Sequence, residues 1–138
     1  MLHIDIHSFS YKKGGIPKDN SGNGGGFAFD CRGILNPGRI EEYKALTGKD
    51  ISVQEYLEQK TEMPKFLELI KNLVSISIDD YLVRGFENLQ INFGCTGGQH
   101  RSVYSAEKIA EFIKDKYPQT QVNIHHDEQP QLNNLDVV

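Results

Sequence analysis

The apolar residues of this 138-residue chain follow two periodicities, and these predict the order of its elements. Alternating apolar and polar positions, the pattern of a half-buried strand, occur at residues 2–8, 27–31, 89–93 and 121–125. Apolar residues at three- and four-residue steps, typical of amphipathic helices, occur at 52–59, 61–85 and 103–117. A shorter helix is expected at 39–46. Strands separated by helices predict a single α/β domain with a mainly parallel sheet of about four strands flanked by helices.

The longest predicted helix has Thr61 as its expected N-cap and Gly85 as its expected stop. Apolar residues recur along one side of it, and we interpret that stripe as core packed against the sheet. Its members are Met63, Phe66, Leu67, Ile70, Leu73, Val74, Ile78, Tyr81 and Leu82.

The third predicted strand runs directly into a glycine-rich segment, residues 94–102, and then into a helix. A strand, a glycine-rich turn and a helix N-terminus together direct free backbone N–H groups at an anion. We therefore predict a strand–phosphate-loop–helix unit. The segment closes with His100, Arg101 and Ser102 instead of the Gly-Lys-Ser/Thr of a Walker A loop, so NTP hydrolysis has no local support.

A small anionic ligand, such as a phosphosugar, is the first interpretation of this segment. Backbone N–H groups, two hydroxyls and the Arg101 guanidinium can together saturate phosphate oxygens. Asp30 and Arg32 follow the second strand, where ligands bind in open α/β sheets. The predicted ligand-binding residues are Thr96, Gly97, Gly98, His100, Arg101, Ser102, Ser8, Asp30 and Arg32.

A cysteine phosphatase is the second interpretation. Cys95, five further residues and then Arg101 reproduce the spacing of a thiolate that faces an arginine-bound phosphate, with Asp30 or Asp5 as general acid. Gly94 stands where those phosphatases usually have histidine. We favour Cys95 as a small buried structural residue, and we assign no catalytic residue.

RNA binding is the third interpretation, with Lys12 and Lys13 as candidate phosphate contacts. The formal net charge of −4 and the lack of a basic run give it little support. Two cysteines cannot form a disulfide framework or a zinc site by themselves, and we expect neither a metal nor a cofactor. Without an apolar run of membrane-spanning length or an N-terminal signal, a cytoplasmic protein that does not interact with membranes is expected.

Residues 94–103, Gly-Cys-Thr-Gly-Gly-Gln-His-Arg-Ser-Val, resemble the hallmark loop of the carboxy-terminal domain of the RapZ/YvcJ family, the RNase adapter proteins. The resemblance continues in order through most of the chain. The further matching segments are Ser8-Phe9-Ser10-Tyr11-Lys12-Lys13-Gly14 with Ile16-Pro17, Phe29-Asp30-Cys31-Arg32, Asn36-Pro37, Thr47-Gly48 with Asp50, and His125-His126-Asp127.

This resemblance implies a domain that binds glucosamine-6-phosphate and small regulatory RNAs, and that presents one RNA to an endoribonuclease. Full-length members also carry a kinase-like domain with Walker motifs, which accounts for their nucleotide-binding label; those motifs are absent from these residues. The family's short basic tail is also missing, because no lysine or arginine follows Asp127, and His126 replaces the arginine of the family's His-Arg-Asp.

The resulting prediction is a ligand-binding domain at residues 1–127 and a flexible tail at 128–138. The expected function is non-catalytic sensing of a small phosphorylated metabolite. RNA binding, phosphatase activity and nucleotide binding remain alternatives, and self-association into a homo-oligomer is left open.

Overall fold

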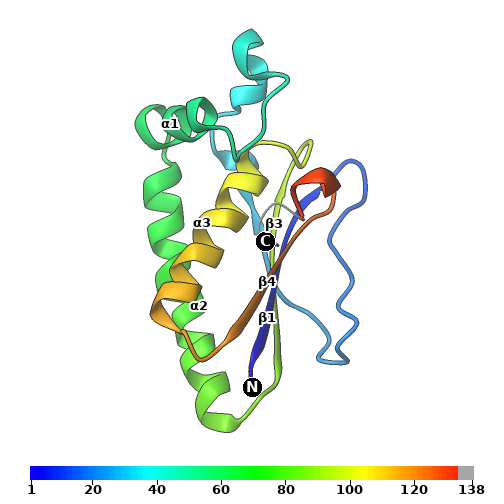
Figure 1. Cartoon of the computed structure of the whole chain (residues 1–138). Coiled ribbons are helices and arrows are strands. Elements are labelled where there is room, and N and C mark those ends of the chain that lie inside the picture. The colour runs from blue at the N-terminus through cyan, green and yellow to red at the C-terminus, as the bar shows by residue number, and fades with distance from the viewer. Residues whose placement is uncertain (134–138) are drawn as a thin grey trace.

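The computed structural model describes residues 1–133 and, apart from residues 39–46, has the predicted order of strands and helices (Figure 1). The strands are β1 (His3–Ser10), β2 (Gly26–Asp30), β3 (Asn88–Cys95) and β4 (Gln121–His126). The helices are α1 (Ile51–Lys60), α2 (Met63–Arg84) and α3 (Arg101–Lys116). The strands form one sheet in the order β2-β3-β1-β4, and every pairing is parallel. The predicted single α/β domain is therefore confirmed.

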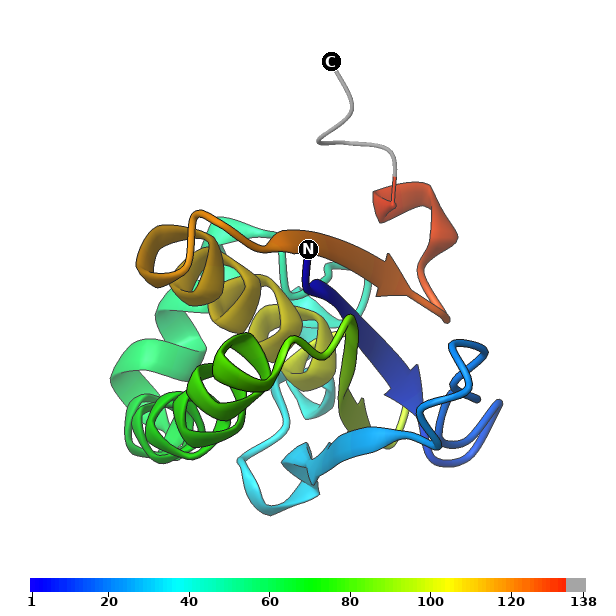
Figure 2. The same ribbon diagram turned by 90° about the horizontal axis from the view of Figure 1, so that it is seen from below.

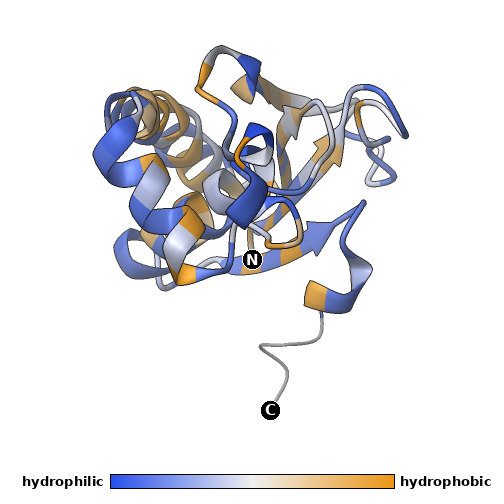
Figure 3. Ribbon diagram, turned by 90° about the horizontal axis from the view of Figure 1, so that it is seen from above, coloured by the Kyte–Doolittle hydropathy of each residue, from blue (hydrophilic) through white to orange (hydrophobic). Residues whose placement is uncertain are grey.

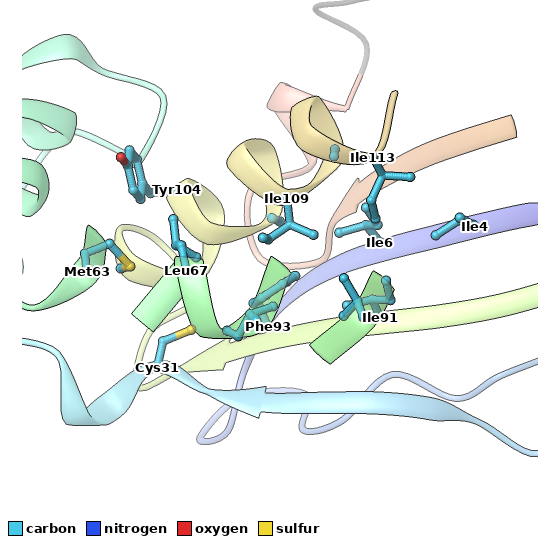
Figure 4. Close-up of a cluster of buried hydrophobic side chains, with 14 of the residues drawn as sticks. Ile4, Ile6, Cys31, Met63, Leu67, Ile91, Phe93, Tyr104, Ile109 and Ile113 are labelled. Atoms are coloured by element: carbon cyan, nitrogen blue, oxygen red, sulfur yellow. The ribbon is translucent and has the colours of Figure 1, made fainter. Parts of the chain in front are cut away.

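The three helices lie on one face of the sheet, as the view along the strands shows (Figure 2). Alternate residues of the central strands point into this layer, where Ile6 of β1 and Ile91 of β3 are fully buried (Figure 4). Ile109 and Ile113 of α3 pack in the same cluster. Each buried aliphatic side chain of this size contributes roughly 1.5–3 kcal/mol, so this layer anchors α3 on the sheet.

The opposite face of the sheet carries polar side chains. The loop from β1 to β2 crosses part of this face in place of a helix (Figure 1). Gln90 Nε2 donates to the Pro17 carbonyl at 3.3 Å and to Asn92 Oδ1 at 2.9 Å. Asn92 Nδ2 donates to the Phe27 carbonyl at 3.0 Å. These bonds satisfy two buried amides, which accounts for polar residues inside β3.

The helix predicted at 39–46 is wrong. Two short 3₁₀ turns, Pro37–Arg39 and Glu41–Tyr43, occupy this segment. Between them Ile40 is extended, with φ −100° and ψ 124°, and an extended residue interrupts helical hydrogen bonding. Two carbonyl groups of the segment accept hydrogen bonds from the Gln99 side chain instead.

Of the two predicted boundaries of α2, the C-terminal one is correct and the N-terminal one is wrong by one residue. Gly85 ends the helix in the left-handed conformation with φ 74°, as expected of a glycine at this position. The N-cap is Glu62 and not Thr61, which ends α1. The Thr61 hydroxyl still accepts a bond from the Met63 N–H at 3.1 Å, so it satisfies one donor of the first turn.

The stripe assigned to the core of α2 needs one correction, because Leu73 is 46% exposed. Its neighbours Ile70 and Val74 are buried against the sheet and α3. At about 100° per residue, Leu73 is turned about 60° from Ile70 and about 100° from Val74, which places it at the margin of the core-facing side.

The tail predicted at 128–138 falls in part on residues 134–138, which lie outside the described residues. Pro130–Leu132 form a 3₁₀ turn, and Asn133 Oδ1 accepts a bond from the His126 N–H at 2.6 Å. Within residues 1–133, no helix combines the length and the apolar character needed to cross a membrane.

Candidate anion-binding site

The carboxyl ends of all four parallel strands meet at one edge of the sheet, the upper edge in Figure 1 and the edge nearest the viewer in Figure 3. Residues 96–100, the β3–α3 loop, lie at this edge and lead into α3. Ligands of open α/β sheets bind outside the carboxyl ends of the strands. This edge is therefore where a site is expected.

Two glycines give the loop its path across this edge. A Cβ at Gly94 would collide with the rings of Phe9 and Tyr11. Gly98 has φ +67°, and a Cβ there would lie 2.9 Å from the Glu128 side chain. Side chains at either position would push the loop outward, so the glycines allow its backbone to pack closely on the strand ends.

A cavity of about 230 Å³ lies beside the loop. Its lining consists of Asn36, Gly38, Lys44, Cys95, Thr96, Gly97, Gln99, His100 and Arg101. Two of these side chains, Lys44 and Arg101, are cationic, and none is a carboxylate, although the chain as a whole has a net charge of −4. The cavity is thus a local positive site on an acidic protein.

The N-terminus of α3 adds to this positive character. The helix has 16 residues, and its N-cap residue, His100, makes no side-chain hydrogen bond to the first turn. The first four N–H groups of a helix have no partner within it, and they carry the positive end of the helix dipole. An anion in the cavity would meet these groups.

A larger groove of about 850 Å³ runs along α3. Lys49, Lys108, Glu107 and Glu111 line it together with Phe112, so both signs of charge are present. No residue of the β3–α3 loop lines it, and carboxylates are part of its lining. We therefore take the smaller cavity as the candidate site.

Arg101 is the most informative residue of the cavity, because it is only 4% exposed. Its Nη1 donates to the carbonyls of Arg32 at 3.2 Å and Ile34 at 2.7 Å. Its Nε is the single buried side-chain nitrogen or oxygen without a hydrogen-bond partner in the described part of the chain. A buried donor without a partner costs roughly 1–3 kcal/mol, so the guanidinium beside the cavity keeps unused hydrogen-bonding capacity.

His100 forms the neighbouring wall and is a neutral imidazole. Its Nε2 lies 2.8 Å from the carbonyl oxygen of Tyr43, which can only accept, so Nε2 carries the hydrogen. Burial lowers the pKa of His100 below its usual range, and the nearby Arg101 charge lowers it further. The other nitrogen, Nδ1, is consequently an acceptor, and it faces Gly38 across the cavity rim.

The opposite wall, residues 43–48, is joined to the loop by hydrogen bonds. Gln99 Nε2 donates to the carbonyls of Lys44 and Leu46, both at 2.7 Å. The Gly48 N–H donates to the Gln99 carbonyl at 3.0 Å. Because these contacts link segments about 50 residues apart in the chain, the loop and the wall are expected to move together.

Gly48→Ala should separate this wall from the loop. A Cβ at Gly48 would collide with the His100 carbonyl and the Tyr104 backbone, neither of which can rotate away. We expect a loss of roughly 1–3 kcal/mol in the free energy of unfolding, measured by urea denaturation. Gly33→Ala is the matched control, since nothing lies within 4 Å of a Cβ there. Equal losses in both variants would contradict the packing role of Gly48.

The predicted ligand residues divide into three groups. Four of them, Thr96, Gly97, His100 and Arg101, line the cavity. Gly98 shapes the loop, as described above. The structure does not bring the remaining four into the lining.

Ser102 and Ser8 are both fully buried. Ser102 Oγ lies 3.1 Å from Cys95 Sγ. Ser8 Oγ lies 2.6 Å from Nδ1 of His126, whose Nε2 is 2.7 Å from Glu107 Oε2. Ser8 therefore belongs to a buried hydrogen-bonded chain in the core and not to the cavity.

Asp30 and Arg32 form an ion pair at 2.8 Å, and both side chains are more than 40% exposed. The Arg32 guanidinium also lies 4.0 Å from the centre of the Tyr11 ring. Only the backbone carbonyl of Arg32 reaches the site, where it accepts a hydrogen bond from Arg101. Lys12 and Lys13 are exposed in the loop after β1.

The cysteine–arginine pair of a phosphatase is present, since Cys95 and Arg101 both line the cavity. The expected general acids are poorly suited. The hydrogen bond from Arg32 holds the pKa of Asp30 below its usual range, so Asp30 is ionised. Asp5 lies five residues before Ser10 at the end of β1, which is roughly 16 Å along the strand.

Sequence reasoning missed four residues of the cavity: Asn36, Gly38, Lys44 and Gln99. Asn36 was noted only as part of a segment that resembles the family, and Gly38 was not singled out. Lys44 and Gln99 carry no local signal, because their role depends on the contact between the wall and the loop. Among residues 1–133, no group of three or more His, Cys, Asp or Glu side chains is arranged to hold a metal ion.

The fold and the cavity define the class: a parallel α/β domain with a strand–glycine-loop–helix unit at the carboxyl edge of its sheet. The chain belongs to the RapZ C-terminal domain family, whose family model matches residues 2–130. The resemblance seen in the sequence is therefore confirmed.

Curated relatives agree with this assignment. The chain is 37% identical over 126 residues to a nucleotide-binding protein of Endomicrobium trichonymphae, covering 91% of the chain and 42% of the relative. It is 41% identical over 123 residues to a nucleotide-binding protein of Thermoanaerobacter sp. strain X514, covering 89% and 40%. For a nucleotide-binding protein of Bacillus licheniformis the identity is 40% over 114 residues, covering 83% and 37%. The chain thus spans about two fifths of the length of these relatives.

Proposed function

We propose that this domain binds a small phosphorylated metabolite, a sugar phosphate of the glucosamine-6-phosphate type, and does not transform it. The observation that carries the proposal is Arg101, a buried guanidinium whose Nε has no partner beside a cavity without carboxylates. The family resemblance supports the sugar phosphate as the class of ligand.

The phosphate group would sit between the β3–α3 loop and the first turn of α3. Backbone N–H groups of Thr96, Gly97 and Gly98 would bind its oxygens, and the Arg101 guanidinium would supply a positive charge beside it. Hydrogen bonds to charged groups contribute roughly 1.5–3 kcal/mol each. Lys44, whose ammonium is 2.9 Å from Glu41 on the exposed rim, adds a second positive charge.

The sugar would lie against His100. Because Nε2–H is engaged by Tyr43, the Nδ1 acceptor favours a ligand that donates, such as a hydroxyl or ammonium group. The proposal gives Ser8, Asp30 and Arg32 no direct contact with the ligand, since each has partners outside the cavity.

Two alternatives use the same region of the molecule. Small-RNA binding would add Lys12 and Lys13 to a phosphate-binding face. Nucleotide binding is what the names of the relatives say of those proteins. A cavity of about 230 Å³ is small for a nucleotide, since pockets for drug-sized ligands range over roughly 300–1,000 Å³.

A titration followed by amide NMR tests the proposal. Glucosamine-6-phosphate should shift the amide signals of residues 96–102 and of Lys44, and orthophosphate should shift the loop signals alone. An unperturbed spectrum at millimolar ligand would refute the proposal. AMP and a short RNA, added in separate titrations, should bind more weakly than the sugar phosphate.

The phosphatase alternative has its own assay. Turnover of an aryl phosphate that disappears in Cys95→Ser would establish it. We expect no turnover by the parent chain, since Cys95 is only 3% exposed and its Sγ contacts Ser102 Oγ.

A further inference from the structure

Two histidines lie side by side on the face of the sheet that carries no helix. His7 of β1 and His125 of β4 are paired in the register of these adjacent strands (Figure 1), and their ring centroids are 4.7 Å apart. The next residues, Ser8 and His126, point into the helical layer instead. Neither histidine of the pair lines the anion-binding cavity, so the proposed function does not use them.

Each ring of the pair has a carboxylate beside one nitrogen. Nδ1 of His7 lies 2.9 Å from Asp127 Oδ1, and Nε2 of His125 lies 3.6 Å from Asp5 Oδ1. Asn123 Nδ2 donates to the same Asp5 oxygen at 3.4 Å. Among residues 1–133, these histidines are the only ion-pair partners of the two aspartates. Two carboxylates beside uncharged imidazoles, without a lysine or arginine to balance them, favour a cation.

The carboxylates also decide which ring nitrogen is free. A carboxylate oxygen only accepts, so Nδ1 of His7 carries the hydrogen, and Nε2 of the neutral ring has the lone pair. The contact of His125 with Asp5 likewise favours the hydrogen on Nε2 and the lone pair on Nδ1. A metal-bound histidine almost always donates its other N–H to a carboxylate, a backbone carbonyl or water, which fixes the orientation of the ring. The pair therefore has the partners that metal-binding histidines use.

We propose that His7 Nε2 and His125 Nδ1 bind one divalent transition-metal ion, of the zinc type, between β1 and β4. Imidazole nitrogens suit Zn²⁺, which they bind at about 2.0–2.1 Å. Two nitrogens on one ion are thus at most about 4 Å apart. Rings with centroids 4.7 Å apart can reach this separation by rotation about their terminal torsions, which are broad. Within residues 1–133, no group of three or more His, Cys, Asp or Glu is arranged to hold an ion, so water completes the coordination.

The pair is accessible, and its position gives a bound ion a structural effect. The side chain of His7 is 19% exposed and that of His125 is 46% exposed. Because β4 is an edge strand whose neighbour in the sheet is β1, the ion would fasten this edge to the centre of the sheet. The expectation that the chain holds no metal rested on its two cysteines. It did not weigh this pair, which forms only when β1 and β4 meet.

Calorimetric titration of the 138-residue chain with ZnCl₂ in phosphate-free buffer tests the proposal. We expect the parent to bind Zn²⁺, and His7→Gln and His125→Gln each to bind at least about tenfold more weakly. His3→Gln is the matched control, because His3 is exposed on the same strand and the same face. It should bind like the parent. A parent that does not bind Zn²⁺ at millimolar concentration, or an equal loss in all three variants, would overturn the proposal.

The roles of the nitrogens and of the carboxylates are tested separately. In long-range ¹H–¹⁵N spectra of the imidazole rings, saturating Zn²⁺ should shift Nε2 of His7 and Nδ1 of His125. Asp127→Ala should weaken Zn²⁺ binding by roughly 10- to 100-fold, the usual effect of losing the carboxylate partner of a metal-bound histidine. Zn²⁺ bound through Nδ1 of His7, or an Asp127→Ala chain with the affinity of the parent, would refute the assigned arrangement. Circular dichroism verifies that each variant keeps the secondary structure of the parent.

Discussion

Arg101→Met is expected to weaken glucosamine-6-phosphate binding by roughly 30- to 150-fold, equivalent to about 2–3 kcal/mol. Methionine keeps much of the length and apolar stem of arginine but removes the charge and every donor. The phosphate would lose the buried cation beside it. The measurement is a calorimetric or NMR titration at constant ionic strength.

Two further variants separate the contribution of positive charge to binding from that of the planar Arg101 guanidinium. Lys44→Met removes the other cation of the lining, but Lys44 is exposed, so we expect less than a tenfold loss. Arg101→Lys keeps the charge without the planar fork and should bind between the parent and Arg101→Met. An Arg101→Met chain that folds and binds like the parent would refute the proposed site.

Arg101→Met should also lower the free energy of unfolding by roughly 1–3 kcal/mol. The carbonyls of Arg32 and Ile34 would lose their donor, although the Nε without a partner would also disappear. The binding titration is therefore performed below the unfolding transition, which urea denaturation locates for each variant.

His126→Leu is expected to cost roughly 1–3 kcal/mol of stability, the range for leaving a buried polar group without its hydrogen-bond partner. His126 is 1% exposed and joins Ser8 to Glu107 through bonds of 2.6 and 2.7 Å. Burial alone would raise the pKa of Glu107, but its bond to His126 and the nearby Lys49 hold that pKa below its usual range. Leucine would leave a carboxylate and a hydroxyl with fewer partners in the core.

The neighbouring residue provides the matched control. His125 is 46% exposed, and its Nε2 lies 3.6 Å from Asp5. His125→Leu should change stability by less than about 1 kcal/mol, as for other exposed ion pairs. Urea denaturation of both variants gives the comparison. Similar losses of stability at the two positions would mean that the hydrogen bonds joining Ser8, His126 and Glu107 contribute little to the free energy of unfolding.

The sequence predicted the fold because the local signals agree with the global arrangement. Strand alternation, helical spacing and the glycine stop at Gly85 each describe a few consecutive residues, and the structure preserves them. The helix expected at 39–46 was wrong because Ile40 is extended and separates two short 3₁₀ turns. The contact of this segment with Gln99 joins residues more than 50 positions apart in the chain, so it leaves no periodic pattern in the sequence.

The distinction between local sequence patterns and contacts of distant residues also applies to the cavity. Thr96, Gly97, His100 and Arg101 could be predicted because they are contiguous and open a helix. Lys44 and Asn36 could not, since only the folded wall brings them to the loop. The prediction that Ser8 binds the ligand was wrong. Ser8 lies near the carboxyl end of its strand, but its hydroxyl points into the helical layer, toward His126.

The position of β1 in the sheet has a consequence for how the chain reaches its native state. β1 is central, and both of its neighbours, β3 and β4, lie far along the chain, with Asn88 and Gln121 paired to His3. During synthesis the first strand is made long before either partner, and pairings of such separation slow folding. We therefore expect refolding to be slower than that of helical bundles, which fold in roughly microseconds to milliseconds.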